Sequence, residues 1–192
     1  MKLILVRHGE TEENVKKINQ GHRPGKLTAL GKEQANKLAQ QLKDEKIDVI
    51  YCSDLKRTKD TLPPILRFHK RTPVHYVSEI REKGMGVFEG TERGSIRRHV
   101  KKHGAHYPTF RPKGGESFRD VKRRNIRFYQ KMLKRHSNQT VLWVTHEGVI
   151  INVLLYVKGW PDKHYKKLSQ ENAAMTIIEV NPPHKPIFHS NE

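Results

Sequence analysis

The chain contains a single cysteine, Cys52, among 192 residues, so it cannot form a disulfide bond within itself. Chains with so little cysteine are typical of reducing compartments, and we therefore expect a cytoplasmic protein. No apolar run approaches the roughly 20 residues that a membrane-spanning helix needs. The sequence passes directly into a predicted strand, so no signal peptide and no membrane partner are expected.

Negative charge is also scarce, because 20 acidic residues stand against 38 basic ones and leave a formal net charge of +18. Hydrophobic residues make up only 34% of the sequence, but a chain of this length can still bury a full core. We therefore predict a single domain over residues 1–192 with a strongly basic surface. Such a surface favours anionic partners, among them nucleic acid, acidic membranes and phosphorylated metabolites, and charge alone does not choose among them.

Short apolar runs alternate with amphipathic helical patterns along the chain. The predicted strands are residues 3–6, 48–52, 73–77, 140–145 and 173–180. The clearest helical patterns lie at 28–43, 94–102 and 149–157, and a further long one begins at Ser117 and includes Leu133. This alternation predicts an α/β fold with three αβα layers around a mostly parallel sheet. Residues 91–115 are the least regular stretch, and we interpret them as a lid-like insertion that sets substrate specificity. An ordinary solvated excursion is the alternative.

Local signals place several element boundaries. Thr28 and Ser117 are expected to cap the helices that follow them, and Ser53 to cap a third helix. The Pro63-Pro64 pair predicts a kink or a new helix starting at Pro63. Residues after Pro182 are expected to form a tail.

Two of the apolar runs end in a histidine. The first ends in Arg7-His8-Gly9, and the run at 140–145 ends in His146. Because ligands bind beyond the carboxyl ends of the strands in open α/β sheets, both imidazoles are expected at one site. Neutral imidazole can attack phosphorus, and arginine supplies fixed positive charge for phosphoryl oxygens. The pattern predicts phosphoryl transfer through histidine.

Further motifs accompany these histidines in a fixed order. They are Arg7-His8-Gly9-Glu10-Thr11 with Asn14, Gln20-Gly21 followed by Leu27-Thr28, Gly31 and Gln34-Ala35, Ser53-Asp54-Leu55-Lys56-Arg57 with Thr61, Glu82 with Gly86, Phe88, Glu89 and Gly90, Gly114-Gly115-Glu116-Ser117, and Val144-Thr145-His146. The whole series resembles the histidine phosphatase superfamily, which contains the cofactor-dependent phosphoglycerate mutases. The resemblance covers nearly the whole chain and implies a phosphoglycerate mutase-like fold.

The resemblance also implies a role for each candidate residue. His8 would carry the phosphoryl group, and Glu82 would protonate the leaving alcohol and then activate water. The phosphoryl oxygens would be bound by Arg7, Arg57 and His146. Asn14, Gln20 and Gly21 would lie near the phosphate or the leaving group. Such a mechanism requires neither a metal nor an organic cofactor.

Two departures from the family pattern bear on the activity. Glu147 stands where many members have glycine, and its carboxylate would repel a phosphate unless it points away or pairs with a basic group. Action on the leaving group is the alternative. Mutases of the family tend to carry an aromatic residue where this chain has Met85, and they are typically longer. We therefore predict a phosphomonoester hydrolase with a small-molecule substrate, as a monomer or homodimer; mutase-type transfer is the alternative.

Other readings of the basic residues remain open. His99, His103 and His106 are spaced so that they could bind Zn²⁺. Two basic clusters would suit a polyanion or nucleic acid: Arg93, Arg97, Arg98, Lys101 and Lys102, and Lys122, Arg123, Arg124, Arg127, Lys131, Lys134 and Arg135. Solvated helix faces explain the same residues. A further hypothesis is that the first of these clusters selects substrates with more than one phosphate, which charge reversal at Arg97 and Lys101 would test.

Overall fold

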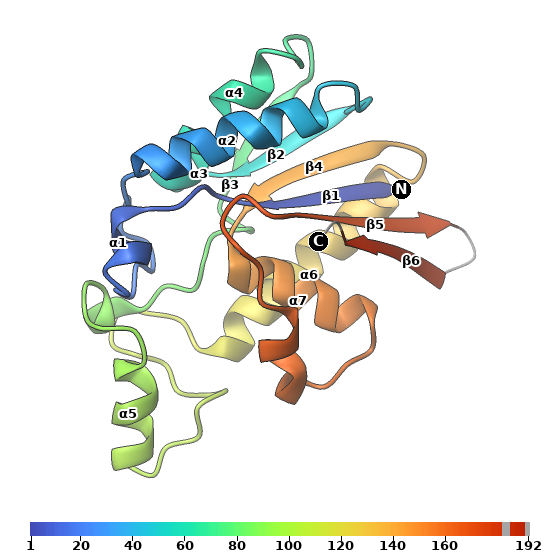
Figure 1. The fold of residues 1–192 in the computed structure, drawn as a ribbon. Coiled ribbons are helices and arrows are strands. Elements are labelled where there is room, and N and C mark those ends of the chain that lie inside the picture. Colours follow the sequence, from blue (N-terminus) through green and yellow to red (C-terminus); the bar gives the residue numbers. More distant parts are fainter. Residues whose placement is uncertain (182–184, 191–192) are drawn as a thin grey trace.

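The computed structural model describes residues 1–181 and 185–190, which include a six-stranded sheet in the order β3-β2-β4-β1-β5-β6 (Figure 1). The strands are β1 (Lys2–Arg7), β2 (Val49–Ser53), β3 (Val74–Val77), β4 (Thr140–Thr145), β5 (Met175–Asn181) and β6 (Lys185–Ser190). Strands β1 to β4 run parallel, whereas β5 and β6 are antiparallel to their neighbours. The predicted mostly parallel sheet is therefore confirmed.

Helices cover both faces of this sheet. They are α1 (Glu12–Val15), α2 (Ala29–Leu42), α3 (Lys56–Thr61), α4 (Pro63–Leu66), α5 (Ser95–Lys102), α6 (Phe118–Arg135) and α7 (Glu147–Val157), with the 3₁₀ helices η1 (Gly86–Phe88) and η2 (Asp162–Leu168). Side chains alternate along β1, so Leu3 and Leu5 pack into one core cluster with α6 and α7. Ile4 and Val6 pack into the other cluster, with α2 and α4. The predicted three layers follow from this alternation.

Several predicted helix boundaries are confirmed by their capping bonds. The Thr28 side chain accepts a hydrogen bond from the backbone N–H of Gly31 at 2.9 Å, at the start of α2. Ser117 and Asp120 form a reciprocal capping box at the start of α6. A new helix, α4, begins at Pro63. Proline is tolerated there because the first helical N–H needs no partner within the helix.

Two other expectations were wrong. Ser53 does not cap a helix, because Leu55 is the N-cap residue of α3 and makes no side-chain capping bond. The Ser53 hydroxyl lies instead 2.9 Å from Nε2 of His146, a tertiary partner that local sequence cannot reveal. The stretch after Pro182 is not simply a tail, since residues 185–190 form β6 along the free edge of β5. Residues 182–184 and 191–192 lie outside the described part.

The segment 91–115 contains α5, which lies on the side of the sheet where β1 and β4 end and away from the layers of the sheet (Figure 1). The beginning of this segment is tied to the loop after α1. Asn19 donates its backbone N–H to the Thr91 carbonyl at 2.8 Å and its side-chain amide to the Ser95 hydroxyl at 3.0 Å. Within the described residues, no helix is long and apolar enough to cross a membrane.

Candidate active site

His8 stands immediately after β1 and is only 4% exposed. Its backbone N–H donates to the Thr145 carbonyl at 3.0 Å, which continues the ladder between β1 and β4. Nδ1 lies 2.7 Å from the carbonyl oxygen of Gly9. A carbonyl only accepts, so Nδ1 carries the proton and Nε2 keeps its lone pair. Burial, reinforced by Arg57 and Arg7, holds the pKa of His8 well below its usual value, and the imidazole is neutral.

The turn that places His8 depends on two glycines. A Cβ atom on Gly9 would collide with the carbonyl oxygen of Gly31, and one on Gly31 would collide with the carbonyl oxygen of Glu10. The turn therefore packs directly against the first turn of α2. Thr61 fixes its other side, because its hydroxyl accepts from the Gly9 N–H at 3.0 Å and donates to the Arg57 carbonyl at 2.7 Å. His8 is held by backbone packing on two sides.

Two buried guanidinium groups flank His8. Arg57 donates through Nη1 to the Arg23 carbonyl at 2.9 Å and through Nη2 to the Gly21 carbonyl at 3.0 Å. Burial lowers the pKa of Arg57 to about 10, so it remains charged at neutral pH. Arg7 contacts the carbonyl oxygen of Gln170. In the described part of the chain, the Nε atoms of both arginines lack a hydrogen-bond partner. Both groups retain donors for an anion.

His146 is fully buried at the N-cap position of α7, and its ring centroid lies 5.3 Å from that of His8. Its Nε2 lies 2.9 Å from the Ser53 hydroxyl, whereas Nδ1 has no partner among the described residues. When the hydroxyl donates to Nε2, Nδ1 carries the proton and is a free donor. Burial, followed by the charge of Arg57, holds the pKa of His146 well below its usual value. The two strand-end histidines therefore meet, as the sequence predicted.

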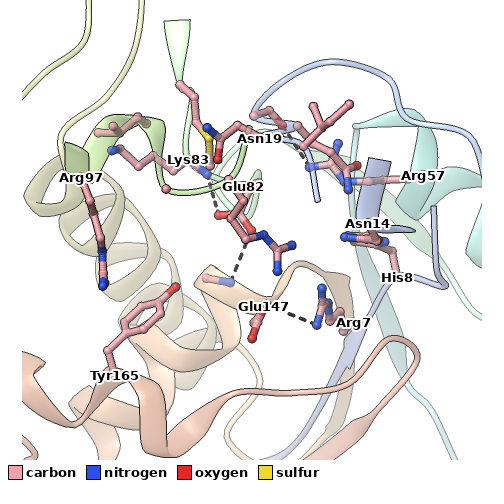
Figure 2. Close-up of a pocket in the computed structure, with 18 of the residues that line it drawn as sticks. Arg7, His8, Asn14, Asn19, Arg57, Glu82, Lys83, Arg97, Glu147 and Tyr165 are labelled. Atoms are coloured by element: carbon pink, nitrogen blue, oxygen red, sulfur yellow. Dashed lines mark hydrogen bonds and ion pairs between the residues drawn. The ribbon is translucent and has the colours of Figure 1, made fainter. Parts of the chain in front are cut away.

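Glu82 lies in the loop after β3 and lines the same cavity as His8, a space of about 400 Å³ (Figure 2). Its Oε1 accepts from the backbone N–H of Lys83 at 2.8 Å, and its Oε2 accepts from that of Gly148 at 3.4 Å. A Cβ atom on Gly148 would lie 2.5 Å from Oε1. The absence of a side chain at Gly148 therefore lets the carboxylate reach the cavity.

Glu147, the departure from the family pattern, is paired with a basic group. Its Oε2 lies 3.3 Å from Nη1 of Arg7 (Figure 2). Its Oε1 accepts from the Ser169 hydroxyl at 2.5 Å and from the Gln170 N–H at 3.4 Å. Of the arrangements that the sequence left open, pairing with a cation is the one observed. Glu147 thus fixes the direction in which Arg7 points and offsets part of its charge.

The three residues predicted near the phosphate or leaving group all line the cavity: Asn14, Gln20 and Gly21. The Asn14 side chain is oriented by its Oδ1, which accepts from the Thr11 N–H at 3.1 Å. Gln20 donates to the Thr11 hydroxyl at 2.8 Å, and its own Oε1 has no partner among residues 1–181. Gly21 adopts a φ of +55°, a conformation that glycine tolerates best, and its carbonyl receives Arg57.

Arg124 holds the Glu82 loop in place, a role that the sequence did not reveal. It donates through Nη1 to the carbonyls of Ser78, Glu79 and Arg81, at 3.2, 2.9 and 3.0 Å. Its Nη2 also lies 2.9 Å from Glu116, whose Oε2 accepts from the Gly84 N–H at 2.9 Å. The sequence placed Arg124 in a basic cluster for a polyanion, but its guanidinium is engaged within the protein.

Replacing Arg124 with methionine is expected to lower the free energy of unfolding by about 2 kcal/mol, because several charge-assisted hydrogen bonds are lost at once. It should also lower kcat about tenfold by loosening the loop that carries Glu82. Chemical denaturation and steady-state kinetics measure both effects. Arg123→Met is the matched control, since the neighbouring Arg123 is exposed on α6. Equal effects of the two substitutions would contradict the assigned role.

The other residues that line the cavity lie close to predicted site residues in the sequence, belong to the segment 91–115 that was expected to set specificity, or come from η2. They are Ile18, Asn19, Lys83, Met85, Arg93, Gly94, Ile96, Arg97, Tyr107, Gly148 and Tyr165. Tyr165 belongs to η2, a helix that the sequence analysis did not assign. Nothing in the local pattern around Tyr165 marks it as part of a site, because η2 reaches the cavity through its packing against α7, which is a tertiary contact.

The three histidines considered for zinc lie in or near α5. The rings of His99 and His103 are 4.2 Å apart, and His99 also packs against Phe88 at 5.3 Å. The Nδ1 atom of His106 lies 3.3 Å from the Thr109 hydroxyl. Across the described ranges, no group of three or more His, Cys, Asp or Glu side chains is arranged to hold a metal ion.

Comparison with known proteins adds an independent finding. The family model for the histidine phosphatase superfamily (branch 1) matches residues 3–192. A broad-specificity phosphatase of Saccharomyces cerevisiae is 34% identical over 186 residues, covering 93% of this chain and 79% of the relative. Phosphoserine phosphatase 1 of Hydrogenobacter thermophilus is 34% identical over 198 residues, covering 100% and 92%. The crystal structure of the alpha-ribazole phosphatase from Shigella flexneri has a TM-score of 0.85 at 28% identity, covering 99% and 95%.

Proposed function

The chain belongs to the histidine phosphatase superfamily, and from this premise we propose that it is a metal-independent phosphomonoesterase that acts on small molecules through a phosphohistidine. Its relatives are phosphatases, which supports hydrolysis of phosphate esters. One observation carries the mechanism: the neutral His8, with its Nε2 lone pair unused, lines the same cavity as two arginines and Glu82.

In the first step, the Nε2 lone pair of His8 attacks phosphorus, and the bond between phosphorus and the ester oxygen breaks. An alkoxide leaves poorly, so the protonated Glu82 gives its proton to that oxygen and the alcohol departs. The phosphoryl group is now bonded to His8. The hydrogen bond from Nδ1–H to the Gly9 carbonyl stabilises the positive charge that develops on the ring.

In the second step, the Glu82 carboxylate takes a proton from a water molecule, whose oxygen attacks phosphorus. The bond between phosphorus and Nε2 breaks, and the electron pair returns to the imidazole. The products are the alcohol and inorganic phosphate, and both His8 and Glu82 regain their initial protonation states. One carboxyl group thus serves as general acid and then as general base.

The remaining residues stabilise charge and position the substrate. Arg7, Arg57 and Nδ1 of His146 would donate to the phosphoryl oxygens, which carry the negative charge throughout the reaction. All three donors are buried, so water competes weakly with the phosphoryl group. Glu147 would act by keeping Arg7 in position rather than by contacting the phosphate. Asn14, Gln20 and Gly21 would border the leaving group.

Hydrolysis is favoured over mutase-type transfer on two grounds. The relatives named above are phosphatases. Met85 also stands in the cavity at the position where mutases of the family tend to have an aromatic residue. A phosphoglycerate mutase would need to retain the phosphoryl group on His8 long enough to return it to a second hydroxyl.

The proposal is tested by measuring phosphate release from 4-nitrophenyl phosphate and from a panel of alkyl phosphates in the presence of EDTA. Full activity in the chelator is expected, since no step requires a metal. A second assay supplies a phosphoglycerate and its bisphosphate primer. Rapid isomerisation with little phosphate release, or complete loss of hydrolysis in EDTA, would contradict the proposal.

A further inference from the structure

The active-site cavity continues into a second cavity of about 340 Å³. The two share Glu82, Lys83, Met85, Arg97, Tyr107, Gly148 and Tyr165. Beyond these shared residues, the second cavity has apolar walls from Pro108, Phe118 and Val121, and its polar lining comes from Asn152, Asp162 and Lys163. The rings of Phe118 and Tyr165 pack edge to face, with centroids 5.5 Å apart. A leaving group that extends away from His8 therefore has an apolar compartment into which its carbon skeleton fits.

The active-site cavity carries more positive charge than one phosphoryl group requires. Its cations are Arg7, Arg57, Lys83, Arg93 and Arg97, and its carboxylates are Glu82 and Glu147. The proposed chemistry uses the arginines beside His8, and Glu147 already pairs with Arg7. Lys83 and Arg97 lie on the other side of the cavity from Arg7 and His8 (Figure 2). The proposed mechanism gives their charge no role in binding the transferred phosphoryl group.

Lys83 is the strongest sign that an anion binds on this side. The residue is only 8% exposed, and burial lowers the pKa of its ammonium group by more than the nearby charges of Glu82 and Glu116 raise it. Within the described residues, this ammonium forms no ion pair or hydrogen bond; its one ring contact is with Tyr107, at 5.6 Å from the centroid. Removing a cation from water is costly unless an anion compensates it. A ligand carboxylate or phosphate would supply that compensation.

Tyr107 brings a second cation to the same place. The guanidinium carbon of Arg97 lies 5.2 Å from the centroid of its ring. Lys83 follows Glu82 directly, whereas Arg97 lies in α5 and Tyr107 in the loop after it. Two chain segments therefore converge on one aromatic ring at the border of the two cavities. Contact with the ring face restrains both long side chains before any ligand arrives.

We propose that Lys83 and Arg97 form a second anion-binding subsite for a carboxylate or phosphate carried by the leaving group of the substrate. The carbon skeleton between the two anionic groups lies along Tyr107 and the apolar wall of the second cavity. This inference rests on the proposed function, because it assigns the phosphoryl end of the substrate to His8. It also replaces Lys101 of the sequence hypothesis by Lys83, since Lys101 is exposed and lines neither cavity.

The test uses three phosphate esters that share a three-carbon chain: propyl phosphate, 3-(phosphonooxy)propanoate and propane-1,3-diyl bisphosphate. The kcat/KM of each is measured for the wild type, Lys83→Gln, Arg97→Gln and the control Lys101→Gln. The intrinsic reactivity of a substrate is the same for every variant, so a changed ratio between substrates reports a changed interaction with the protein. The carboxylate and the bisphosphate distinguish the two kinds of second anion.

The wild type is expected to prefer at least one of the two substrates that carry a second anionic group to propyl phosphate. The expected ratio of kcat/KM is about tenfold or more, as a charge-assisted contact provides. Lys83→Gln and Arg97→Gln should each reduce that preference several-fold, while Lys101→Gln retains it. Equal kcat/KM values for all three esters in an active wild type would overturn the subsite and leave the proposed function standing. A preference that Lys101→Gln reduces as much as the other variants would also overturn it. Failure to hydrolyse any phosphate ester would remove both proposals.

Discussion

Replacing His8 with alanine is expected to lower phosphate release by about 10⁴-fold or more, because no other group offers a nucleophile to the phosphorus. His8 is the imidazole whose Nδ1 is engaged by Gly9 and whose Nε2 is left with a lone pair in the cavity. Rates are measured with 4-nitrophenyl phosphate in EDTA. The folded state of the variant is checked by thermal unfolding, since a buried side chain is truncated.

The matched control for this substitution is His103→Ala. His103 is exposed at the end of α5 and does not line the active-site cavity. Its removal should leave the rate near that of the wild type. A folded His8→Ala variant that retains a tenth or more of wild-type activity would contradict the assignment of the nucleophile.

Replacing Glu82 with glutamine is expected to lower kcat for alkyl phosphates by about 10²–10⁴-fold, the usual contribution of a general acid. The loss in the phosphorylation step should be much smaller for 4-nitrophenyl phosphate, since nitrophenolate departs without a proton. Glutamine keeps the size of the side chain and can still accept from the N–H groups of Lys83 and Gly148. Single-turnover measurement of alcohol release with both classes of substrate separates the lost proton from lost geometry.

Glu79→Gln provides the control, because Glu79 belongs to the same loop but does not line the cavity. It should leave both substrate classes unaffected. Equal losses on alkyl and aryl esters in Glu82→Gln would show that the carboxylate does not protonate the leaving oxygen. In that case its contribution would be limited to the second step or to structure.

The elements of the fold could be predicted where the pattern is local. The apolar runs predicted the four strands that run parallel. Thr28 and Ser117 cap their helices through residues three positions away. The site was predictable for a related reason: carboxyl ends of neighbouring parallel strands share one edge. His8 and His146 follow the paired strands β1 and β4, and their rings lie 5.3 Å apart.

Features that depend on distant partners could not be predicted in the same way. Serine is a common helix-capping residue, but the hydroxyl of Ser53 contacts His146, which follows the neighbouring strand β4. Arg124 resembles its exposed neighbours on α6, and only the packing of the Glu82 loop gives it carbonyl partners. The strand β6 depends on the free edge of β5, which a sequence pattern does not display.

Glu147 illustrates both the use and the limit of such reasoning. Electrostatics alone required a carboxylate beside a phosphate pocket to point away or to pair with a basic group. Its partner could not be named, because Arg7 lies 140 positions earlier in the sequence and is brought near by the pairing of β1 with β4. The sequence therefore indicated that the Glu147 carboxylate must point away or pair with a cation, but it did not indicate which cation.

The most direct test of the account is to capture the phosphorylated enzyme during turnover of 4-nitrophenyl phosphate. In Glu82→Gln, phosphorylation should proceed while hydrolysis of the intermediate is slowed, so the phosphoryl group should accumulate. Rapid quenching followed by peptide mapping is predicted to find an acid-labile, base-stable phosphoryl group on the peptide that contains His8, and to find none in His8→Ala. Turnover by an enzyme that carries its phosphoryl group on another residue, or never carries one, would contradict the account.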